Sequence, residues 1–188
     1  MQTSRSASFR LVAAVAILVS LAAWPAAAQQ DRKETVPGIY NYTQVDASVA
    51  CGGATDPSAI AELKKRGFVS IVNFRLAVER GSDVAGEEAA AKKVGIKYFH
   101  LPLNPADPLP SVADAFLKVV TDKANQPVYI HCATASRVGA MWLIKRVLVD
   151  GWTIDRATKE AELIGLRGEG LKTFALDYIK SHEKAHQR

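Results

Sequence analysis

The sequence has few of the residues and motifs that bind metals, nucleotides or nucleic acids. Its 188 residues include only two cysteines and four histidines, which are scattered and form no Cys-x-x-Cys pair. That spacing does not fit a zinc site. The chain has no glycine-rich nucleotide fingerprint and no basic cluster of the kind that follows a nucleic-acid backbone. We therefore expect no metal, no cofactor and no nucleic-acid partner.

The N-terminal segment has the order typical of a secretory signal peptide. Arg5 and Arg10 precede an almost wholly apolar run over residues 11–24, and Ala28-Gln29 follows as a small-residue cleavage site. A bilayer span needs about 20 apolar residues, so this run is short for a membrane helix, although an uncleaved anchor is the alternative. We expect cleavage after Ala28 and an exported protein, periplasmic or secreted, without a stable membrane span.

Removing residues 1–28 takes two basic and no acidic residues. The net charge then falls from +5 to +3, with 22 basic and 19 acidic residues remaining. Such a mild positive charge favours anionic substrates. The remaining chain fits one domain: we expect a flexible lead over residues 29–38 and a single catalytic domain over residues 39–188.

Strand and helix patterns alternate along this domain. Because such alternation is typical of βα units, we predict an α/β fold with a mainly parallel central sheet and helices on both faces. Residues 51–53 (Cys-Gly-Gly) read as a turn. The expected strands are 39–45, 68–74, 97–101 and 128–130, and the expected helices are 57–66, 87–94, 112–122, 138–149, 153–164 and 171–185.

The central feature is the stretch from Pro127 to Trp142, which reads as a strand, a short polar loop and a buried helix. Cys132 lies on the loop, where the N-terminus of the following helix stabilises a thiolate or a bound anion. Arg137 adds a planar guanidinium that holds two oxygens of an oxyanion. The loop residues Ala133, Thr134, Ala135 and Ser136 would supply amides and two hydroxyls.

A purely structural interpretation is also open for this loop. In that interpretation Cys132 is a buried cysteine that ends a core strand, and Ser136 is the N-cap of the next helix.

These residues resemble the cysteine-dependent (tyrosine/dual-specificity) phosphatase superfamily, whose loop runs His-Cys, five residues, then Arg. The closest resemblance is to the phosphatase-like domain of beta-lactamase-hydrolase-like proteins, over about residues 45–166. The resemblance implies a cysteine-phosphatase-like fold, with Cys132 as nucleophile, Arg137 as oxyanion clamp and His131 as a supporting partner of the cysteine. Here four residues separate Cys132 from Arg137, the loop has no glycine, and Val138 stands where phosphatases usually carry a hydroxyl residue.

Three functions follow from the loop. The first is hydrolysis of a phosphate ester through a Cys132 phosphocysteine, with a small anionic molecule or a phosphorylated protein as substrate. The second is sulfur transfer through a Cys132 persulfide, because the four-residue spacing equals that of rhodaneses. The third is a non-catalytic module that binds an oxyanion.

Other candidate residues lie where strands end, since ligands of such sheets bind there. Asp107, in a proline-rich loop, is the candidate proton donor for the leaving group or else a solvated aspartate, and Asp114 is a weaker one. Arg75 is a candidate oxyanion ligand or else an ordinary surface charge. His100 is expected to be packed in its strand.

Cys51 leaves three interpretations open. It could form a disulfide with Cys132, act as a redox partner that resolves an oxidised or persulfidated Cys132, or be inert.

Overall fold

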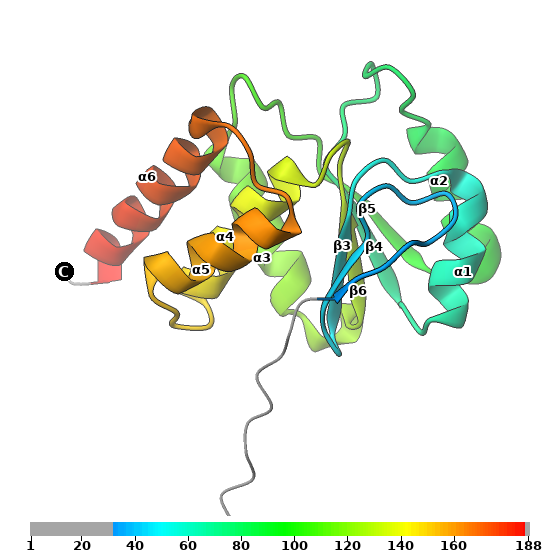
Figure 1. The fold of residues 1–188 in the computed structure, drawn as a ribbon, viewed down its shortest axis with the longest axis horizontal. Helices are drawn as coiled ribbons and strands as arrows, with labels where there is room; N and C mark the ends of the chain where they lie inside the picture. Colours follow the sequence, from blue (N-terminus) through cyan, green and yellow to red (C-terminus); the bar gives the residue numbers. More distant parts are fainter. Residues whose placement is uncertain (1–31, 187–188) are drawn as a thin grey trace, which may run out of the picture.

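The structure is a computed structural model that describes residues 32–186 (Figure 1). The expected signal peptide over residues 1–28 and the first residues of the lead lie outside this part of the chain. Among the described residues, no helix is both long and apolar enough to cross a bilayer.

A six-stranded sheet forms the centre of the molecule, in the order β1-β2-β3-β6-β4-β5. The strands β3, β6, β4 and β5 are parallel, whereas β1 and β2 add an antiparallel edge. The predicted α/β class and mainly parallel sheet are therefore confirmed. The strands are β1 (Arg32–Lys33), β2 (Thr43–Asp46), β3 (Val49–Gly52), β4 (Ser70–Asn73), β5 (Lys97–His100) and β6 (Val128–His131).

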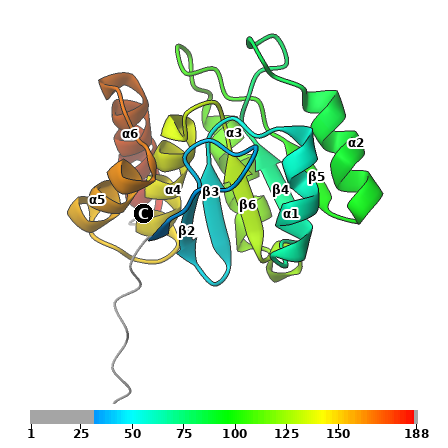
Figure 2. The ribbon, with the colours of Figure 1, turned by 45° about the vertical axis from the view of Figure 1, so that its right-hand side comes forward.

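Helices cover both faces of the sheet, as predicted. The helices α1 and α2 pack on one face, and α3, α4, α5 and α6 lie on the other (Figures 1 and 2). The helical segments are η1 (Pro57–Ala59), α1 (Ile60–Lys65), α2 (Val84–Val94), α3 (Pro110–Thr121), η2 (Lys123–Asn125), α4 (Ser136–Leu148), α5 (Ile154–Ile164) and α6 (Glu169–His186).

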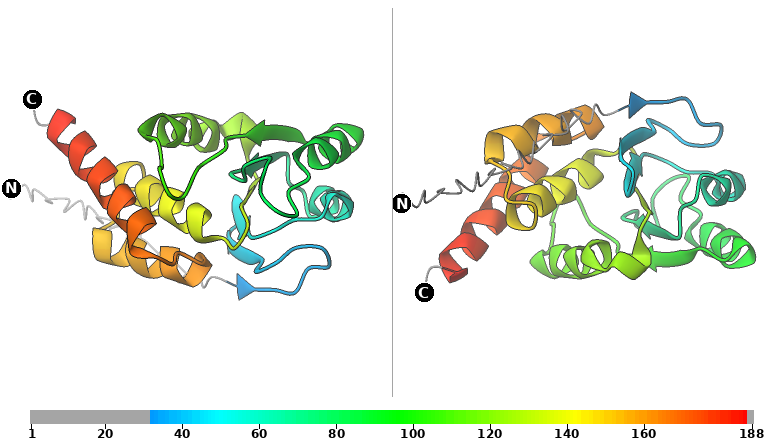
Figure 3. Two further views of the ribbon diagram at one scale, coloured as in Figure 1. Left: turned by 90° about the horizontal axis from the view of Figure 1, so that it is seen from above. Right: turned by 90° about the horizontal axis from the view of Figure 1, so that it is seen from below.

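The helix α4 is the most deeply buried helix segment, and its sequence explains why. Ten of its thirteen residues are buried, and a helix that is apolar on nearly every face must be enclosed by other elements. It lies between the sheet and the outer helices α5 and α6 (Figure 3). Because β6 is also buried along its whole length, the loop that joins β6 to α4 leaves the core between two rigid elements.

Two expectations about the N-terminal part of the domain were wrong. Within the expected flexible lead, Arg32 and Lys33 pair with β2, and Val36 is buried, so the packed unit begins by residue 32 rather than 39. The expected turn at Cys51 is instead the end of the buried strand β3. The glycine at 52 serves close packing, because a Cβ there would lie 2.1 Å from the Tyr129 hydroxyl oxygen.

Candidate active site

The loop between β6 and α4 is fixed to the neighbouring strand at its start. The amide of Cys132 donates to the carbonyl of Gly52 (3.3 Å), and the amide of Ala54 donates to the carbonyl of Ala133 (2.8 Å). Cys132 itself is only 1% exposed. These contacts hold the cysteine at the carboxyl end of the central strand, where the sequence placed it.

Ala135 turns the chain into α4. It is the N-cap residue, with a left-handed backbone (φ 71°) that a side chain makes unfavourable by about 1 kcal/mol. Its methyl fits because residue 165 is glycine: a Cβ on Gly165 would lie 2.9 Å from the Ala135 Cβ. The alternative with Ser136 as N-cap is therefore wrong, and Ser136 is the first helical residue.

The amides of this loop form a set of unused donors. Within the described residues, the N–H groups of residues 133–137 donate to no protein acceptor, and the first amide to do so is that of Gly139, to Ala135 (2.9 Å). Free amides at a helix N-terminus, together with the helix dipole, stabilise an anion. The side chain of Thr134 is exposed here, whereas the Ser136 hydroxyl is occupied by the backbone of Arg167 (2.7 and 2.9 Å).

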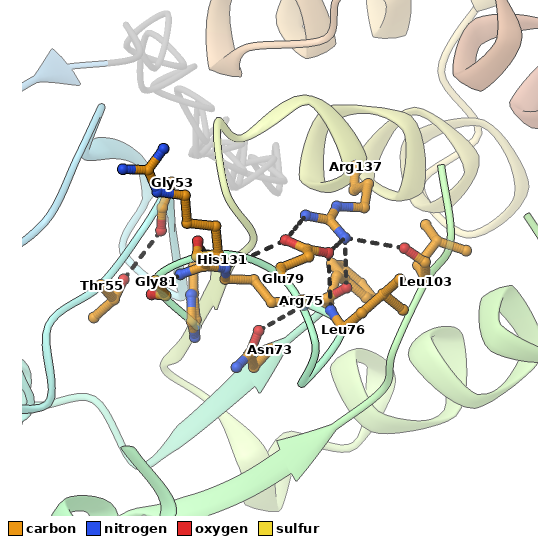
Figure 4. Close-up of polar contacts among 12 residues, drawn as sticks. Gly53, Thr55, Asn73, Arg75, Leu76, Glu79, Gly81, Leu103, His131 and Arg137 are labelled. Carbon is orange, nitrogen blue, oxygen red and sulfur yellow. Dashed lines mark hydrogen bonds and ion pairs between the residues drawn. The ribbon is translucent and has the colours of Figure 1, made fainter. Parts of the chain in front are cut away.

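Arg137 is buried beside this loop with part of its guanidinium occupied (Figure 4). Its Nη1 donates to Glu79 Oε1 (2.5 Å) and to the carbonyls of Phe74 and Leu103 (3.1 Å each), and its Nη2 donates to Glu79 Oε2 (2.9 Å). A guanidinium has five N–H bonds. Nε–H and the second Nη2–H therefore remain for other acceptors, and two parallel donors are what an oxyanion needs.

The charge of Arg137 is secured by its surroundings. Burial alone would lower the pKa of Arg137, but the hydrogen bonds that Arg137 donates to Glu79 and its electrostatic interactions with Cys132 and Glu79 outweigh burial and raise the pKa. The positive charge of Arg137 consequently lies close to Cys132.

Glu79 is the permanent counter-ion of Arg137. Burial would raise the pKa of this carboxyl, but hydrogen bonds from Arg137, the Leu76 amide (2.9 Å) and Arg75 lower the pKa to about 2. Glu79 is thus ionised at neutral pH and cannot donate a proton to a leaving group. Sequence reasoning missed Glu79, because a lone acidic residue in an irregular loop carries no periodic signal.

Arg75 holds the loop that carries Glu79, and it is not a surface charge. It is buried, and it donates to the carbonyls of Gly81 (2.7 Å) and Arg80 (2.8 Å) and to Glu79 Oε2 (3.4 Å) (Figure 4). All three nitrogens are used within its own loop. The contacts therefore connect Arg75 to Arg137 through Glu79 rather than to the Cys132 loop directly.

His131 points to the opposite face of β6 from Cys132. Its ring is fully buried and stacks on Tyr129, and its Nε2 lies 3.0 Å from Glu87 Oε2. Glu87 is buried as well and accepts from Asn73 (3.0 Å) and Tyr98 (2.8 Å). Sequence reasoning missed Glu87 too, since an acidic residue in the first turn of a helix is ordinarily solvated.

Asp107, Asp114 and His100 lie in three different surroundings. Asp107 is exposed in the proline-rich loop, in which Asn104 and Pro105 line the same cavity as Ala133, Thr134 and Arg137. Asp114 accepts a hydrogen bond from Tyr178, in the contact of α3 with α6. His100 contacts the carbonyl of Arg75 (2.8 Å) and is part of the packed sheet edge.

The cavity above the loop has a volume of about 550 Å³. It is bounded by the loop that carries Glu79, the proline-rich loop, the start of α4 and the α5–α6 connection. Its lining residues are Leu76, Glu79, Asn104, Pro105, Ala133, Thr134, Ser136, Arg137, Arg167 and Leu171.

Neither cysteine forms a disulfide in the structure, and both are buried. Cys51 lies in β3 opposite Ile130, and it belongs to the same core cluster as Cys132. The structure thus places the two thiols on one side of the sheet without a bond between them. Within the described residues, no group of three or more acidic, histidine or cysteine side chains could hold a metal ion.

Comparison with known proteins agrees with this geometry. Residues 41–149 match the family described as the phosphatase-like domain of beta-lactamase hydrolase-like proteins. No curated protein sequence matches the chain significantly.

Solved structures share the fold at low sequence identity. A candidate phosphatase (DUF442) from Shewanella putrefaciens CN-32 is 15% identical with a TM-score of 0.64, covering 77% of this chain and 94% of its own. The core catalytic domain of the PP-IP phosphatase SIW14 from S. cerevisiae is 18% identical with a TM-score of 0.64 (81% and 96% covered). TpbA from P. aeruginosa is 18% identical with a TM-score of 0.62 (82% and 91% covered).

Proposed function

Because the chain belongs to the family of phosphatase-like domains of beta-lactamase hydrolase-like proteins, we propose that it hydrolyses a phosphate ester through a phosphocysteine on Cys132. One observation carries this proposal: the amides of residues 133–137 and one edge of the Arg137 guanidinium are unused donors around a single buried thiol. A dianionic phosphoryl group satisfies such a set of donors.

The reaction has two steps. The Cys132 thiolate attacks phosphorus, and the ester oxygen leaves as the alcohol once it receives a proton. Water then attacks the phosphocysteine, which releases inorganic phosphate and regenerates the thiolate. In both steps the loop amides and Arg137 bind the equatorial oxygens, and stabilising developing charge in this way is often the largest catalytic contribution.

Asp107 is our candidate for the leaving-group proton. The cavity's own carboxylate, Glu79, has a pKa of about 2 and is bound to Arg137, so the donor must come from elsewhere. Asp107 follows two residues that line the cavity, Asn104 and Pro105. General acids contribute about 100- to 10,000-fold. Asp107→Asn should therefore slow an alkyl phosphate far more than an aryl phosphate with a good leaving group, and equal losses would exclude this role.

The substrate class we propose is a small phosphorylated anion or a phosphorylated protein. A cysteine-to-serine variant of TpbA, 16% identical to this chain, was crystallised with phosphotyrosine. SIW14 is named as a phosphatase of PP-IP. Phosphotyrosine and PP-IP are ligands or substrates of those two proteins, and they indicate which phosphate esters should be assayed first with this one.

Sulfur transfer is the second candidate, because the loop holds four residues between Cys132 and Arg137. One residue fewer removes an amide from the cradle and narrows it, which favours a sulfane sulfur. A Cys132 persulfide would form by attack of the thiolate on the outer sulfur of thiosulfate, with sulfite leaving. A cyanide or thiol acceptor would then take the sulfur.

We further propose that the enzyme acts outside the cytoplasm, after removal of residues 1–28. Arg5, Arg10 and the apolar run before Ala28 support this proposal. Intact-mass analysis of exported protein should give a chain that begins at Gln29. A retained Met1 in a membrane fraction would instead identify an anchor.

One assay separates the candidate functions. Purified, reduced protein is tested against an aryl phosphate and against thiosulfate, with Cys132→Ser as control. Release of phosphate that depends on Cys132 is the expected result. Thiocyanate formation from thiosulfate and cyanide without phosphatase activity would identify a sulfurtransferase. Binding of phosphate without turnover of either substrate would identify the non-catalytic module.

A further inference from the structure

We propose that Arg167 binds a second anionic group of the substrate and makes the enzyme select phosphate esters that carry one. The chemical class is an ester whose alcohol bears a carboxylate or another phosphate near the scissile phosphate. This inference rests on the proposed function, since it concerns the same cavity. No part of the sequence pattern marked Arg167, which lies in the connection between α5 and α6.

Arg167 has a fixed place at the mouth of the cavity. It lines the cavity together with Arg137 and Thr134. Its backbone is bound on both sides by one hydroxyl, because Ser136 Oγ accepts from the Arg167 amide (2.9 Å) and donates to the Arg167 carbonyl (2.7 Å). Since Ser136 is the first residue of α4, the position of Arg167 is tied to the Cys132 loop itself.

The guanidinium of Arg167 is oriented but not neutralised. Its Nη1 donates to the carbonyls of Glu162 (2.8 Å) and Leu166 (2.6 Å) at the end of α5. Within the described residues, its Nε and Nη2 donate to no protein acceptor, and no carboxylate forms an ion pair with it. The nearby carboxylate of Glu162 is itself paired with Lys172 (3.3 Å). An oriented cation with an unused donor edge is what a second anionic group needs.

A second hollow of about 480 Å³ shares two lining residues with the cavity. Arg167 and Thr134 line both spaces, and the second is also lined by Lys33 and by Glu162, whose carboxylate is paired with Lys172. Asn41 connects Lys33 in the second hollow to the Cys132 loop, because its side chain accepts a hydrogen bond from Lys33 (2.5 Å) and donates one to the Thr134 carbonyl (3.4 Å). A substrate with one phosphate over Cys132 therefore has room and positive charge for a further anionic group beside Arg167.

The test uses two esters that differ in one charge: a carboxyphenyl phosphate and the methyl ester of the same carboxylate. We compare kcat/KM for both in the wild type, in Arg167→Gln and in Arg167→Lys. Lys159→Gln is the matched control, because Lys159 lines a neighbouring hollow together with Arg167 but does not line the Cys132 cavity. The contacts to Ser136 come from the Arg167 backbone, so the loop anchor survives each substitution.

We expect the wild type to prefer the charged ester by about tenfold, which is the effect of one charge-assisted hydrogen-bonded pair. The preference should fall as salt is added. Arg167→Gln should remove it, Arg167→Lys should retain part of it, and Lys159→Gln should leave it in place. Equal kcat/KM for both esters in the wild type, or an unchanged preference in Arg167→Gln, would overturn the proposal.

If the wild type hydrolyses neither ester, the proposed phosphatase function fails, but the proposal for Arg167 can still be tested. Calorimetric binding of the same two esters to Cys132→Ser then decides the matter for Arg167. Tighter binding of the charged ester that is lost on adding Arg167→Gln would support the second anion site. Equal binding of the two esters would contradict it.

Discussion

The two ends of α4 each bury an arginine, yet the two residues have different kinds of partners. At the start, Arg137 contacts one carboxylate, Glu79, and two carbonyls, and one edge of its guanidinium is left unused. At the other end, Arg146 is surrounded by acidic side chains. The same residue type on one helix thus forms two different environments.

Arg146 has acceptors on every nitrogen. Its Nε and Nη2 bind both oxygens of Glu160 (2.6 and 2.9 Å), and its Nη1 binds Asp150 (2.9 Å). Its guanidinium also lies over the rings of Trp142 and Trp152, 4.8 and 4.2 Å from their centroids. With a carboxylate at each nitrogen, Arg146 holds α4 to its neighbours, and both N–H groups of its Nε–Nη2 edge are occupied.

Burial of an arginine does not by itself identify a functional site. Arg137 and Arg146 are both buried, and interactions with carboxylates raise the pKa of both above its ordinary value. Two features distinguish Arg137 from Arg146. Arg137 has an edge of N–H donors without acceptors among the described residues, and the thiol of Cys132 lies beside it. Substitutions at the two ends should accordingly divide into losses of activity and losses of stability.

The largest effect is expected for Arg137→Lys, which keeps the charge but loses the planar fork. Removing one oxyanion donor typically costs about 100- to 1000-fold in kcat, and we expect a loss near the upper value in phosphate-ester hydrolysis. Arg146→Lys is the matched control at the other end and should retain turnover per folded molecule. Comparable losses of kcat in both variants would contradict the assignment of a functional role to Arg137 and a structural role to Arg146.

Arg146→Met should produce the next largest effect, on stability. Removing one partner of a buried ion pair leaves the carboxylates uncompensated and typically costs about 3–5 kcal/mol. Denaturant unfolding should therefore show a lower midpoint for Arg146→Met than for the wild type. A midpoint equal to that of the wild type would mean that the ion pairs of Arg146 do not contribute to the stability of the protein.

Glu79→Gln tests how much the counter-ion of Arg137 contributes to stability. Losing charge-assisted hydrogen bonds to Arg137 should lower the free energy of unfolding by about 2 kcal/mol at neutral pH. The folded-state pKa of Glu79, about 2, is below its ordinary value of 4.5. The stabilisation is therefore complete above pH 4.5 and is lost as the pH falls through about 2.

The unfolding free energies of wild type and Glu79→Gln should consequently converge between pH 4.5 and pH 2. Denaturant titrations at several pH values measure this difference. A constant difference across that range would show that Glu79 acts through packing rather than through its charge.

The smallest predicted effect concerns the backbone at the start of α4. Gly165→Ala would place a Cβ 2.9 Å from that of Ala135, at a φ of 147°, and should cost about 1–2 kcal/mol and reduce activity. Ala135→Gly removes the opposing methyl and should restore part of the loss. Gly151→Ala, with φ of 69° and nothing within 4 Å, should lower stability at the other end without affecting activity.

The sequence predicted those parts of the site that are local in the chain. The strand, loop and helix from Val128 to Leu148 follow from a continuous apolar pattern, and Cys132 and Arg137 are placed by it. The turn expected at Cys51 was wrong because a glycine can serve close packing against Tyr129 as well as a turn.

The missed residues are brought to the site by tertiary contacts. Glu79 lies 58 positions before its partner Arg137, and Arg167 lies 31 positions after Ser136. Glu87 reads as an ordinary first-turn acid, and only the assembled sheet buries it against His131. Partners so distant in sequence have no spacing rule, and so no pattern in a single sequence could pair them.

Trapping the reaction intermediate tests directly whether Cys132 is the nucleophile. Reduced protein is mixed with an aryl phosphate, quenched in acid within one turnover and analysed by intact-mass and peptide mass spectrometry, with Asp107→Asn and Cys132→Ser in parallel. We predict one phosphoryl group on Cys132, formed together with the released phenol and absent from Cys132→Ser. Turnover of the aryl phosphate by Cys132→Ser, or a phosphoryl group on any other residue, would contradict it.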